Sequence, residues 1–486
     1  MSAWQQLQVA ALLGTQKNSP SPQWPTELAP LMSQFSENSL LNQLAALSAY
    51  QRCAFSAITM ANPTPSSPES LAASTRQQQK WLSYLLSYDG LDYLLDWLNL
   101  ASKKQVAFPA AQLPELLDIG YKHKKLRLAI CQVSGQRGAW LAERNTDWQW
   151  LQGGQISLEN EQLSDYWHTA SAASRELLFE RLRLANPAQA RDFLQQVWRE
   201  EAATTRKLLL EKFSANLSVE DHDFLESCLD DRSRVVNEQT VELLARLQGS
   251  LLQQRLQHTL SQHLTLKKGL IHKSLQIEAI EQVTDVLERD GLNPKAADIK
   301  NGLGEKAQWL RDVIAGVSLD WLSHHYELQA EAFIHAALKT DWAEALLTGL
   351  STAAIRQKHN VWLKALLDVD SKKLALPRFR LFDALSIADK ESWLLAHAAQ
   401  SKKELERGSV FIQFFYQSQP WLWTHYFTIA VMDVYQQQLK LQQSNNQLGH
   451  YLARYGDAQL AQKANQYPTQ IINTWLMRME IEQAFS

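Results

Sequence analysis

The chain has 486 residues, of which 45% are hydrophobic and 20% charged, and its formal net charge at pH 7 is −3. This length exceeds one small domain, and the composition excludes a chain that is disordered over most of its length. The sequence pI of about 6.5 excludes a global electrostatic footprint for nucleic acid or an anionic membrane, although a local basic face stays open.

Cysteine usage and the chain ends predict a cytoplasmic protein. Cys53, Cys131 and Cys228 match no metal-binding or redox spacing, so we expect reduced core thiols. Residues 1–6 lack the basic region and apolar core of a secretory signal. The most apolar later segment, 421–432, is too short to span a bilayer.

The N-terminal part is predicted to contain two helices joined by proline-rich connections. An amphipathic helix is expected over 4–13, and the prolines within 20–30 then predict an extended connection. The segment 62–68 is typical of a surface loop or linker. A second helix is expected around 40–60, packed through Leu41, Leu44, Leu47 and Phe55.

Helical patterns continue through the next sixty residues. Apolar spacing over 81–98 predicts a helical hairpin, broken at Asp89-Gly90. Another helix is expected over 113–120, opened by Pro114. The basic run 121–127 fits a solvated helix start better than a phosphate site.

The string from Gly135 to Trp148 is the least generic in the chain. Two glycines three apart, on either side of Arg137, indicate a backbone turn that a side chain would obstruct. One interpretation is a ligand or partner contact by Arg137. We favour a structural joint between domains, in which Arg137 and Asn145 satisfy buried carbonyls. The residues of this expected joint are Gly135, Arg137, Gly138, Trp140, Asn145 and Trp148.

The stretch from Ala172 to Leu260 shows the plan of the chain most clearly, as four successive amphipathic helices. Asn186-Pro187 predicts one helix start, and Ser218 with Asp221 forms a capping-box variant at another. The stripes expected to be buried are Ala190, Phe193, Leu194, Val197 and Trp198; Leu209, Phe213 and Leu217; Phe224, Leu225, Cys228 and Leu229; and Val236, Thr240, Leu243, Leu244 and Leu247. The side chains expected to be solvated are Arg206, Lys207, Glu211 and Lys212.

The starts at Pro187 and Ser218 give a repeat of 31 residues, a period typical of stacked helical pairs. The run 231–244 resembles the second helix of a HEAT repeat, although Asn237 stands where that motif usually has arginine. An ordinary helical bundle also satisfies these stripes. We favour an all-α, HEAT/armadillo-like α-solenoid of stacked helical pairs.

Three regions are expected along the chain: an N-terminal helical region with proline-rich loops (1–155), HEAT-like helical repeats (156–265), and a C-terminal helical region that continues the array (266–486). The pattern loosens after Leu260, in a polar segment that contains Lys267-Lys268. Later helices also have apolar residues along one face, for example the helix that Asp341 is expected to cap. The tryptophans fit core anchors better than a base-stacking platform.

The search for chemistry finds no catalytic, metal or cofactor motif in the sequence. The adjacent His324 and His325 diverge by about 100° on a helix and do not easily share one metal. The glycine-rich segment 301–306 has alanine where a P-loop needs serine or threonine, and no strand is expected before it. We therefore expect no enzyme activity, no cofactor and no metal.

Several strings together resemble an uncharacterised bacterial family that carries a domain-of-unknown-function label and HEAT-like repeats. They are Ala11-Leu-Leu-Gly-Thr15, Leu113-Pro-Glu-Leu-Leu117, Gly135-Gln-Arg-Gly-Ala-Trp-Leu-Ala142 with Asn145 and Trp148, and Phe224-Leu-Glu to Asp231-Arg-Ser233. The resemblance spans most of the chain. Genes of this family often lie beside those for a MoxR-type AAA+ ATPase, a von Willebrand factor A-domain protein and a SWIM zinc-finger protein. The resemblance therefore implies an accessory or adaptor role with such protein partners.

The expected function is a non-enzymatic protein-binding scaffold, whose inner helices present a groove to another protein. The candidate partner-binding residues are Arg232, Arg234, Asn237 and Glu238. The alternative is a HEAT-like nucleic-acid-binding protein or DNA glycosylase-like enzyme, which needs a continuous cationic face. A third reading, a small-molecule enzyme, needs a deep polar pocket between the helical regions.

Overall fold

The computed structural model describes residues 2–15, 21–35, 39–53, 63–268, 273–295, 303–370, 374–399, 410–440 and 446–486. Over these residues the chain is mostly helical, with two short two-stranded sheets, which confirms the all-α class. The chain divides into two compact units, Met1–Pro65 and Ser66–Ser486, called here the N-terminal unit and the main unit.

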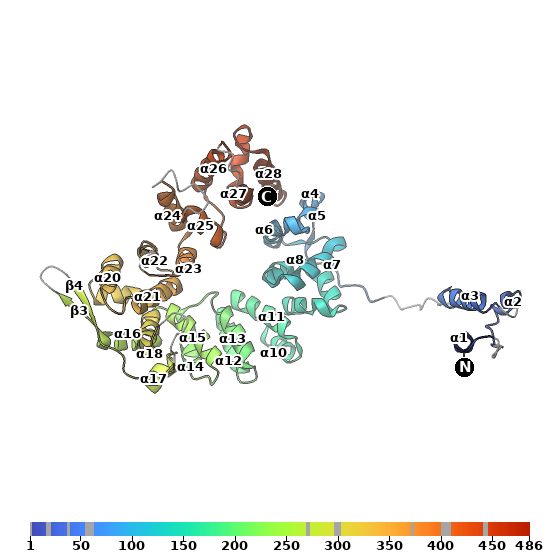
Figure 1. Cartoon of the computed structure of the whole chain (residues 1–486), viewed down its shortest axis with the longest axis horizontal. Coiled ribbons are helices and arrows are strands. Elements are labelled where there is room, and N and C mark those ends of the chain that lie inside the picture. Colours follow the sequence, from blue (N-terminus) through green and yellow to red (C-terminus); the bar gives the residue numbers. More distant parts are fainter. Residues whose placement is uncertain are drawn as a thin grey trace. The chain divides into compact units, whose positions relative to one another are not determined.

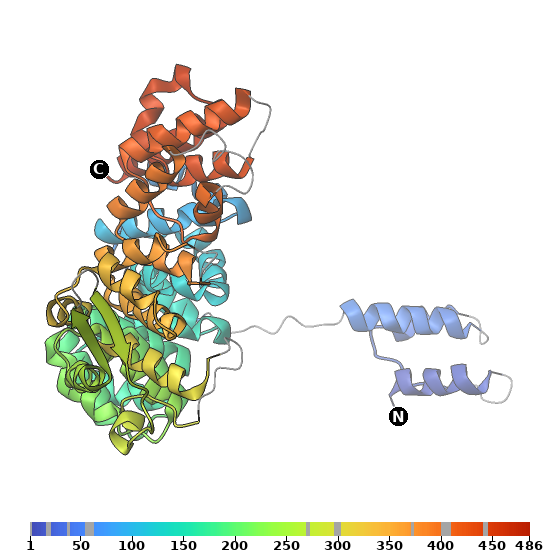
Figure 2. The ribbon, with the colours of Figure 1, turned by 60° about the vertical axis from the view of Figure 1, so that its left-hand side comes forward.

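The N-terminal unit contains α1 (Ala3–Leu13), α2 (Ala29–Met32) and α3 (Leu40–Cys53). Ser2 and Gln5 form a capping box at the start of α1, and Gly14 ends it with φ +84°. Helix α1 packs against α3 (Figure 2). The core cluster of this unit consists of Leu7, Leu28, Met32 and Leu47.

Two expectations for α3 are corrected and one falls outside the described residues. Leu41 was expected to pack, but its side chain points to solvent and is 81% exposed. Cys53 was expected in a core and is exposed, whereas Cys131 and Cys228 are buried, free thiols. Phe55 lies outside the described residues.

The described residues at the start of the main unit form two short strands, three short α-helices and four longer α-helices. They are β1 (Ala72–Ala73), α4 (Arg76–Gln79), α5 (Leu82–Leu85), α6 (Leu91–Lys103), β2 (Val106–Ala107), α7 (Leu113–Lys122), α8 (Arg127–Ala142), α9 (Gln152–Gln155) and α10 (Asn160–Thr169). Strands β1 and β2 pair in parallel, with Ala72 opposite Val106. The break expected at Asp89-Gly90 is confirmed, because a 3-10 turn over Tyr88–Gly90 separates α5 from α6.

The central helices are α11 (Ala172–Ala185), α12 (Pro187–Val197), α13 (Ala203–Lys212), α14 (His222–Cys228), α15 (Arg234–Arg246) and α16 (Leu251–His263). Both expected caps are confirmed: Asn186 accepts from the Gln189 N–H, and Ser218 forms a capping box with Asp221. The predicted stripes are buried, except that Trp198 and Leu217 are half-buried. The expected count of four helices is wrong, because α11 and α16 also belong to this block.

Contacts among the central helices form a regular pattern. Helices α11, α13 and α15 contact one another in turn, while α12 packs against α11 and α14 against α15. The same face continues beyond the block, since α15 also contacts α21. Successive helices therefore bury their stripes in a common core rather than in separate bundles.

A β-hairpin that the sequence analysis did not anticipate follows α16. Strand β3 (Leu264–Lys268) pairs antiparallel with β4 (Lys273–Ile277), with Leu264 opposite Ile277. The next helices are α17 (Asp285–Arg289), α18 (Glu305–Gly316), α19 (Leu319–His325), α20 (Ala330–Ala337), α21 (Ala343–Gln357) and α22 (Asn360–Leu367). Trp342, rather than the expected Asp341, occupies the N-cap of α21.

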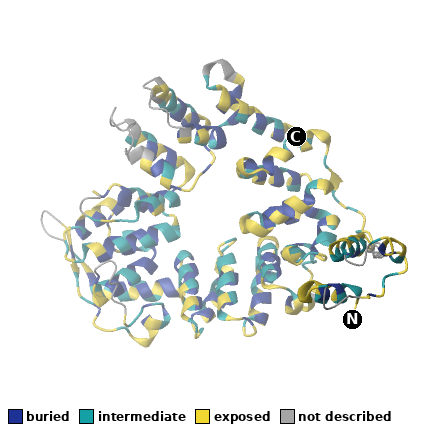
Figure 3. Ribbon diagram, turned by 45° about the vertical axis from the view of Figure 1, so that its right-hand side comes forward, coloured by how far each residue is buried: buried dark blue, intermediate teal, exposed yellow. Residues whose placement is uncertain are grey.

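The C-terminal helices are α23 (Arg378–Ala384), α24 (Ile387–Ala399), α25 (Val410–Gln417), α26 (His425–Lys440), α27 (Asn446–Tyr455) and α28 (Thr469–Ala484). Within the main unit the helices follow one another round a circuit, from α4–α8 through α11–α16 and α18–α23 to α24–α28 (Figure 1). Buried residues recur along the whole circuit (Figure 3).

The circuit closes because α28 packs against α4 and α6. The Phe485 ring meets the edge of Trp97, with ring centroids 5.3 Å apart. Glu480 accepts a hydrogen bond from the Trp81 indole at 2.9 Å. We call these interactions, together with the 2.8 Å ion pair between Arg454 of α27 and Asp96 of α6, the closing contact.

Two hydrophobic cores run through the main unit. The larger extends from Leu163 to Trp475, and the smaller joins Leu82–Leu177 to the apolar side of α28. The boundary between the two compact units lies between Pro65 and Ser66. The expected organisation into 1–155, 156–265 and 266–486 stays a prediction.

Candidate functional site

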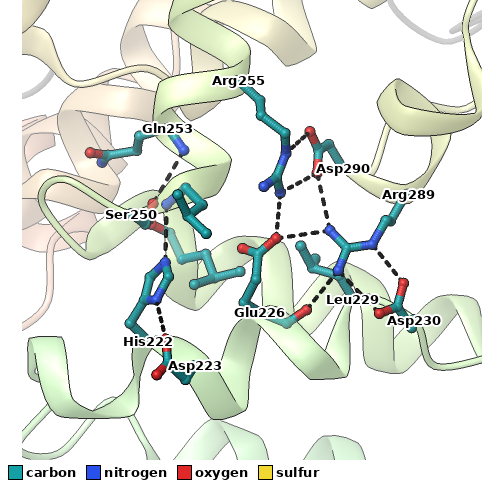
Figure 4. Close-up of polar contacts among 12 residues, drawn as sticks. His222, Asp223, Glu226, Leu229, Asp230, Ser250, Gln253, Arg255, Arg289 and Asp290 are labelled. Carbon is teal, nitrogen blue, oxygen red and sulfur yellow. Dashed lines mark hydrogen bonds and ion pairs between the residues drawn. The ribbon is translucent and has the colours of Figure 1, made fainter.

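A cluster of five charged side chains lies where α14, α16 and α17 meet (Figure 4). The Arg255 guanidinium donates two hydrogen bonds to the Asp290 carboxylate, at 2.8 and 2.7 Å. Arg289 donates to Asp230 at 2.6 Å and to Glu226 at 2.8 Å. Glu226 also pairs with Arg255 at 2.8 Å, so the five side chains form one network, called here the charge cluster.

The surroundings of Asp290 and Asp230 shift the pKa values of the two carboxyls in opposite directions. Burial raises the pKa of the fully enclosed Asp290 carboxyl above its ordinary value, while the hydrogen bonds from Arg255 act in the opposite direction. Hydrogen bonding from Arg289 lowers the pKa of the exposed Asp230 carboxyl. Two guanidiniums, always protonated, thus hold three carboxylates, an arrangement that clamps helices together rather than transferring protons.

Two local features position the charge cluster. Gly291, just after α17, has φ +101°, and a Cβ there would lie 2.9 Å from the Val241 side chain. Only glycine lets the chain turn so close to α15, and this turn brings Arg289 and Asp290 into the cluster. His222 accepts from the Leu251 N–H at 3.1 Å and therefore donates from its other nitrogen to Asp223, which ties α14 to the start of α16.

The four candidate partner-binding residues lie beside this cluster, and three of them are exposed, whereas Asn237 is half-buried. Asn237 donates to the carbonyls of Leu229 and Arg289, at 3.0 and 2.8 Å, and so holds α15 to its neighbours. Arg234 and Glu238 form an exposed ion pair one turn apart on α15. Arg232 is exposed in the turn before α15. Whether any of them binds a partner stays a prediction.

A polar pocket of about 270 Å³ adjoins the charge cluster. It opens where α15, α18 and α21 meet, and Leu256 of α16 also lines it. Its polar walls include Arg234, Glu238, Asp290, Gln308, Asp312 and Arg356. No local pattern predicted this pocket, because its walls come from residues more than a hundred positions apart.

The Gly135 string forms a kink inside α8 rather than a loop. Gly135 has φ +53°, and a Cβ at this position would lie 2.2 Å from the Glu69 carboxylate. Glu69 accepts from the N–H groups of Gln136 and Arg137, at 3.2 and 3.5 Å, and thus caps the second half of the helix. The Arg137 side chain is exposed, which does not support a role in satisfying buried carbonyls, and a ligand or partner contact by Arg137 stays a prediction.

The other residues of this string hold the surrounding turn. Gly138 is needed because a Cβ there would lie 2.5 Å from that of Ser134. Asn145 accepts from the Asp147 N–H at 3.0 Å, so it caps a short 3-10 helix instead of satisfying a buried carbonyl. The Trp148 indole donates to Asp118 at 2.8 Å, and the Arg144 guanidinium lies 4.0 Å above the Trp140 ring. The whole string lies within the main unit.

Buried ion pairs join successive helices of the central block. Arg183 of α11 donates to Asp221, which precedes α14, and both side chains are fully buried. Arg206 of α13 donates to Asp231, before α15, at 2.9 Å. The solvated role expected for Arg206 is therefore wrong, since the residue is 8% exposed. Sequence reasoning missed these pairs because the partners lie 38 and 25 positions apart.

The two lysines of α13 that were expected to be solvated, Lys207 and Lys212, are paired with carboxylates. Lys212 pairs with Glu176 and Glu180, at 3.0 and 3.1 Å. Lys207 pairs with Glu211 at 2.6 Å. On α13, positively charged side chains therefore alternate with carboxylates. Such a surface is unfavourable for binding along a phosphate backbone.

The N-terminal unit presents an apolar surface, called here the leucine face. Its most exposed members are Leu12 at 85%, Leu13 at 65% and Leu41 at 81%. A hollow of about 740 Å³ is lined by Leu12 together with Trp4, Val9, Leu44 and neighbouring glutamines. The unit contains only four charged residues, Lys17, Glu27, Glu37 and Arg52. Of the two that the structure describes, Glu27 and Arg52, neither lines this hollow.

Comparison with family models matches residues 6–481 to a family of unknown function, DUF5691. The chain belongs to this family. The resemblance expected from the sequence is thereby confirmed at the family level, whereas the HEAT-like repeats, bacterial origin and gene neighbours stay predictions. Neither the curated proteins nor the solved structures give a match.

Neither a metal site nor a membrane-spanning helix is found among the described residues. Among the residues that the structure describes, no group of three or more His, Cys, Asp or Glu side chains is placed to hold a metal ion. Across the same parts of the chain, every helix is too short or too polar to cross a bilayer.

Proposed function

We propose that the chain is a non-enzymatic protein-binding scaffold, in which the main unit is a HEAT/armadillo-like α-solenoid of stacked helical pairs, closed end to end. The turn-by-turn contacts of α11, α13 and α15, each with a companion helix, support the stacked arrangement. The closing contact between α28 and α6 supports a rigid frame, because the ends of the array share one core.

The leucine face of the N-terminal unit is the single observation that carries this proposal. Three exposed leucines, of which Leu12 lines an apolar hollow, lie on a unit whose own core cluster has four side chains. Units with so small a core rarely fold stably alone, so additional apolar burial stabilises them. Exposed apolar patches of this kind mark protein interaction sites.

The occupant proposed for the leucine face is an amphipathic helix of a partner protein. The hollow is lined by Trp4, Gln8, Leu12 and other residues of one α1 face, together with Leu44 of α3, a geometry suited to a helix laid into a groove. Because the described residues that line the hollow are uncharged, a partner helix with an apolar stripe and uncharged flanks fits it best. The MoxR-type AAA+ ATPase and the von Willebrand factor A-domain protein implied by the resemblance are the first partners to test. Arg232, Arg234 and Glu238 remain candidates for a second contact on the main unit.

The test compares capture of a partner by the intact wild-type chain and by a Leu12→Glu/Leu41→Glu variant. The wild type is expected to bind a purified candidate partner with fixed stoichiometry. The variant is expected to lose this binding by at least about a hundredfold, because two exposed leucines that the partner would bury are replaced by charges. Cross-links from the bound partner are expected on α1 and α3, and to originate from a helix.

The matched control is Leu422→Glu, which places the same charge at a leucine of the main unit that is 57% exposed. This variant is expected to bind the partner like the wild type. If the leucine-face variant still binds at full strength, the docking role is wrong. Light scattering adds a further check: a wild-type dimer that the leucine-face substitutions dissociate would assign the face to a second copy of the chain and contradict the partner-helix proposal.

A further inference from the structure

The polar pocket between α15, α18 and α21 contains a buried acceptor that nothing in the fold explains. Gln308 is 4% exposed, and its Nε2 donates to both oxygens of Asp312, each at 3.0 Å. These bonds fix the amide orientation, because only the nitrogen can donate to a carboxylate. The Gln308 Oε1 is then left buried, with no hydrogen-bond partner in the part of the chain that the structure describes. Buried acceptors in native proteins nearly always have a donor.

A permanently charged group lies in the same pocket. Arg356 of α21 donates from Nε to Glu242 at 2.7 Å and from Nη1 to the Ala315 carbonyl at 2.9 Å. Within the described residues, no partner is recorded for its second terminal nitrogen, Nη2. An arginine held in this way is pre-organised to bind a carboxylate.

The charges of the pocket walls limit the ligand. The walls carry three arginines, Arg234, Arg311 and Arg356, and three carboxylates, Glu238, Asp290 and Asp312. A ligand with a donor and an anionic group matches this balance, whereas one that carries only a positive charge leaves Arg356 unused.

We propose that this pocket binds a small zwitterion of the amino-acid class, with an ammonium that donates to Gln308 Oε1 and a carboxylate that accepts from Arg356. The pocket volume of about 270 Å³ suits a single amino acid. The site lies on the main unit and is independent of the leucine face. It adds a ligand-binding function to the scaffold.

The test measures thermal unfolding and calorimetric binding of the intact chain with each of the standard L-amino acids. Acetate and methylamine, at equal concentration, serve as the two halves of the ligand. At least one amino acid is expected to bind one-to-one and to raise the Tm, because a ligand of the native state stabilises it, whereas neither half alone does so. If no amino acid binds, or if acetate or methylamine has an equal effect, the proposal is wrong.

Two variants locate the binding. Gln308→Met removes the acceptor, and Arg356→Lys keeps a positive charge beside Glu242 but removes the guanidinium fork; each is expected to weaken binding at least about tenfold. The matched control is Gln357→Met, because the Gln357 amide also bonds to the backbone, at Val317 and Leu319, but lies outside the pocket walls. The control is expected to lower the Tm and to retain binding. Unchanged binding by Arg356→Lys would overturn the proposal even if Gln308→Met does not fold.

Discussion

The two compact units of this chain solve the problem of stability in different ways. The main unit buries long apolar stripes in continuous cores and closes its circuit through α28. The N-terminal unit has a core cluster of four side chains and exposes leucines that a larger protein would bury. The main unit therefore contains its own stabilising interactions, whereas in the proposed function the N-terminal unit gains stability from the surface of a partner.

Charge is used differently in the two units as well. In the main unit, buried pairs such as Arg183 with Asp221 lock successive helices together. In the N-terminal unit only four of 65 residues are charged, and its packing has no comparable ion pair among the described residues. The difference indicates that buried ion pairs help to fix the helix register in the main unit, whereas the N-terminal unit packs mainly through apolar contacts, with one exposed hydrogen bond from Tyr50 to Glu27.

The largest contrast is expected from one substitution made in both units. Leu7→Ala and Leu244→Ala each remove a fully buried leucine, at a cost of about 2–5 kcal/mol in the free energy of unfolding. Leu7→Ala is expected to unfold α1 and α3, because the small core cannot lose that much stability. Leu244→Ala is expected to leave the main unit folded. Limited proteolysis reports which region is cut. Equal resistance of α1 and α3 in the wild type and in Leu7→Ala would contradict the comparison.

The next largest effect is expected in the buried ion pair of the main unit. Asp221→Asn leaves the enclosed Arg183 guanidinium without its counter-charge and is expected to lower the free energy of unfolding by about 3–5 kcal/mol. Glu238→Gln, at the exposed pair with Arg234, is the control and is expected to change it by less than about 0.5 kcal/mol. Urea unfolding measures both, and similar small losses would show that the buried pair does not lock the helices.

A smaller effect on stability is expected at Gly153, where α9 approaches α11 closely. A Cβ on Gly153 would lie 2.0 Å from the Ser174 carbonyl oxygen, so Gly153→Ala is expected to destabilise the main unit by about 1–3 kcal/mol. Gly304→Ala is the control, because a Cβ there meets no atom within 4 Å. The two changes in Tm are expected to differ clearly. A tolerated Gly153→Ala would mean that α9 can move away from α11.

The smallest effect is expected in the pH dependence of the closing contact. The hydrogen bond from Lys80 lowers the pKa of Glu480 below its ordinary 4.5, so this interaction adds stability above that pH and loses it as the pH falls. The stability difference between wild type and Glu480→Gln, followed by denaturant unfolding, is therefore expected to shrink below pH 4.5. A difference that stays constant with pH would exclude this contribution.

Local signals in the sequence were sufficient to predict much of the central block. Caps such as Asn186 and Ser218, and stripes with a period of 3.6 residues, depend on neighbours within one or two turns. The β3–β4 hairpin was missed, although Leu264, Leu266 and Leu275 alternate with polar residues as strands do.

Features that depend on distant partners were not predictable from local patterns. Trp97 and Phe485 meet across almost the whole chain, so nothing near either residue indicates the closing contact. By its sequence, the segment 151–155 looks like a linker, but the structure shows that it contains helix α9. Gly153 and Gly154 are buried in α9, where they let it approach Ser174 and Cys131. A glycine pair is compatible with a flexible linker or with close packing, and only the fold distinguishes the two.

Amide hydrogen exchange on the intact chain tests most directly whether the N-terminal unit completes its core on a partner. In the chain alone, amides of α1 and α3 are predicted to exchange at least about a hundredfold faster than those of α11–α15, because fewer buried contacts hold them. Binding of the partner is predicted to slow exchange in α1 and α3 by a similar factor. Protection of α1 and α3 equal to that of α11–α15 in the chain alone, or unchanged exchange on binding, would contradict the account.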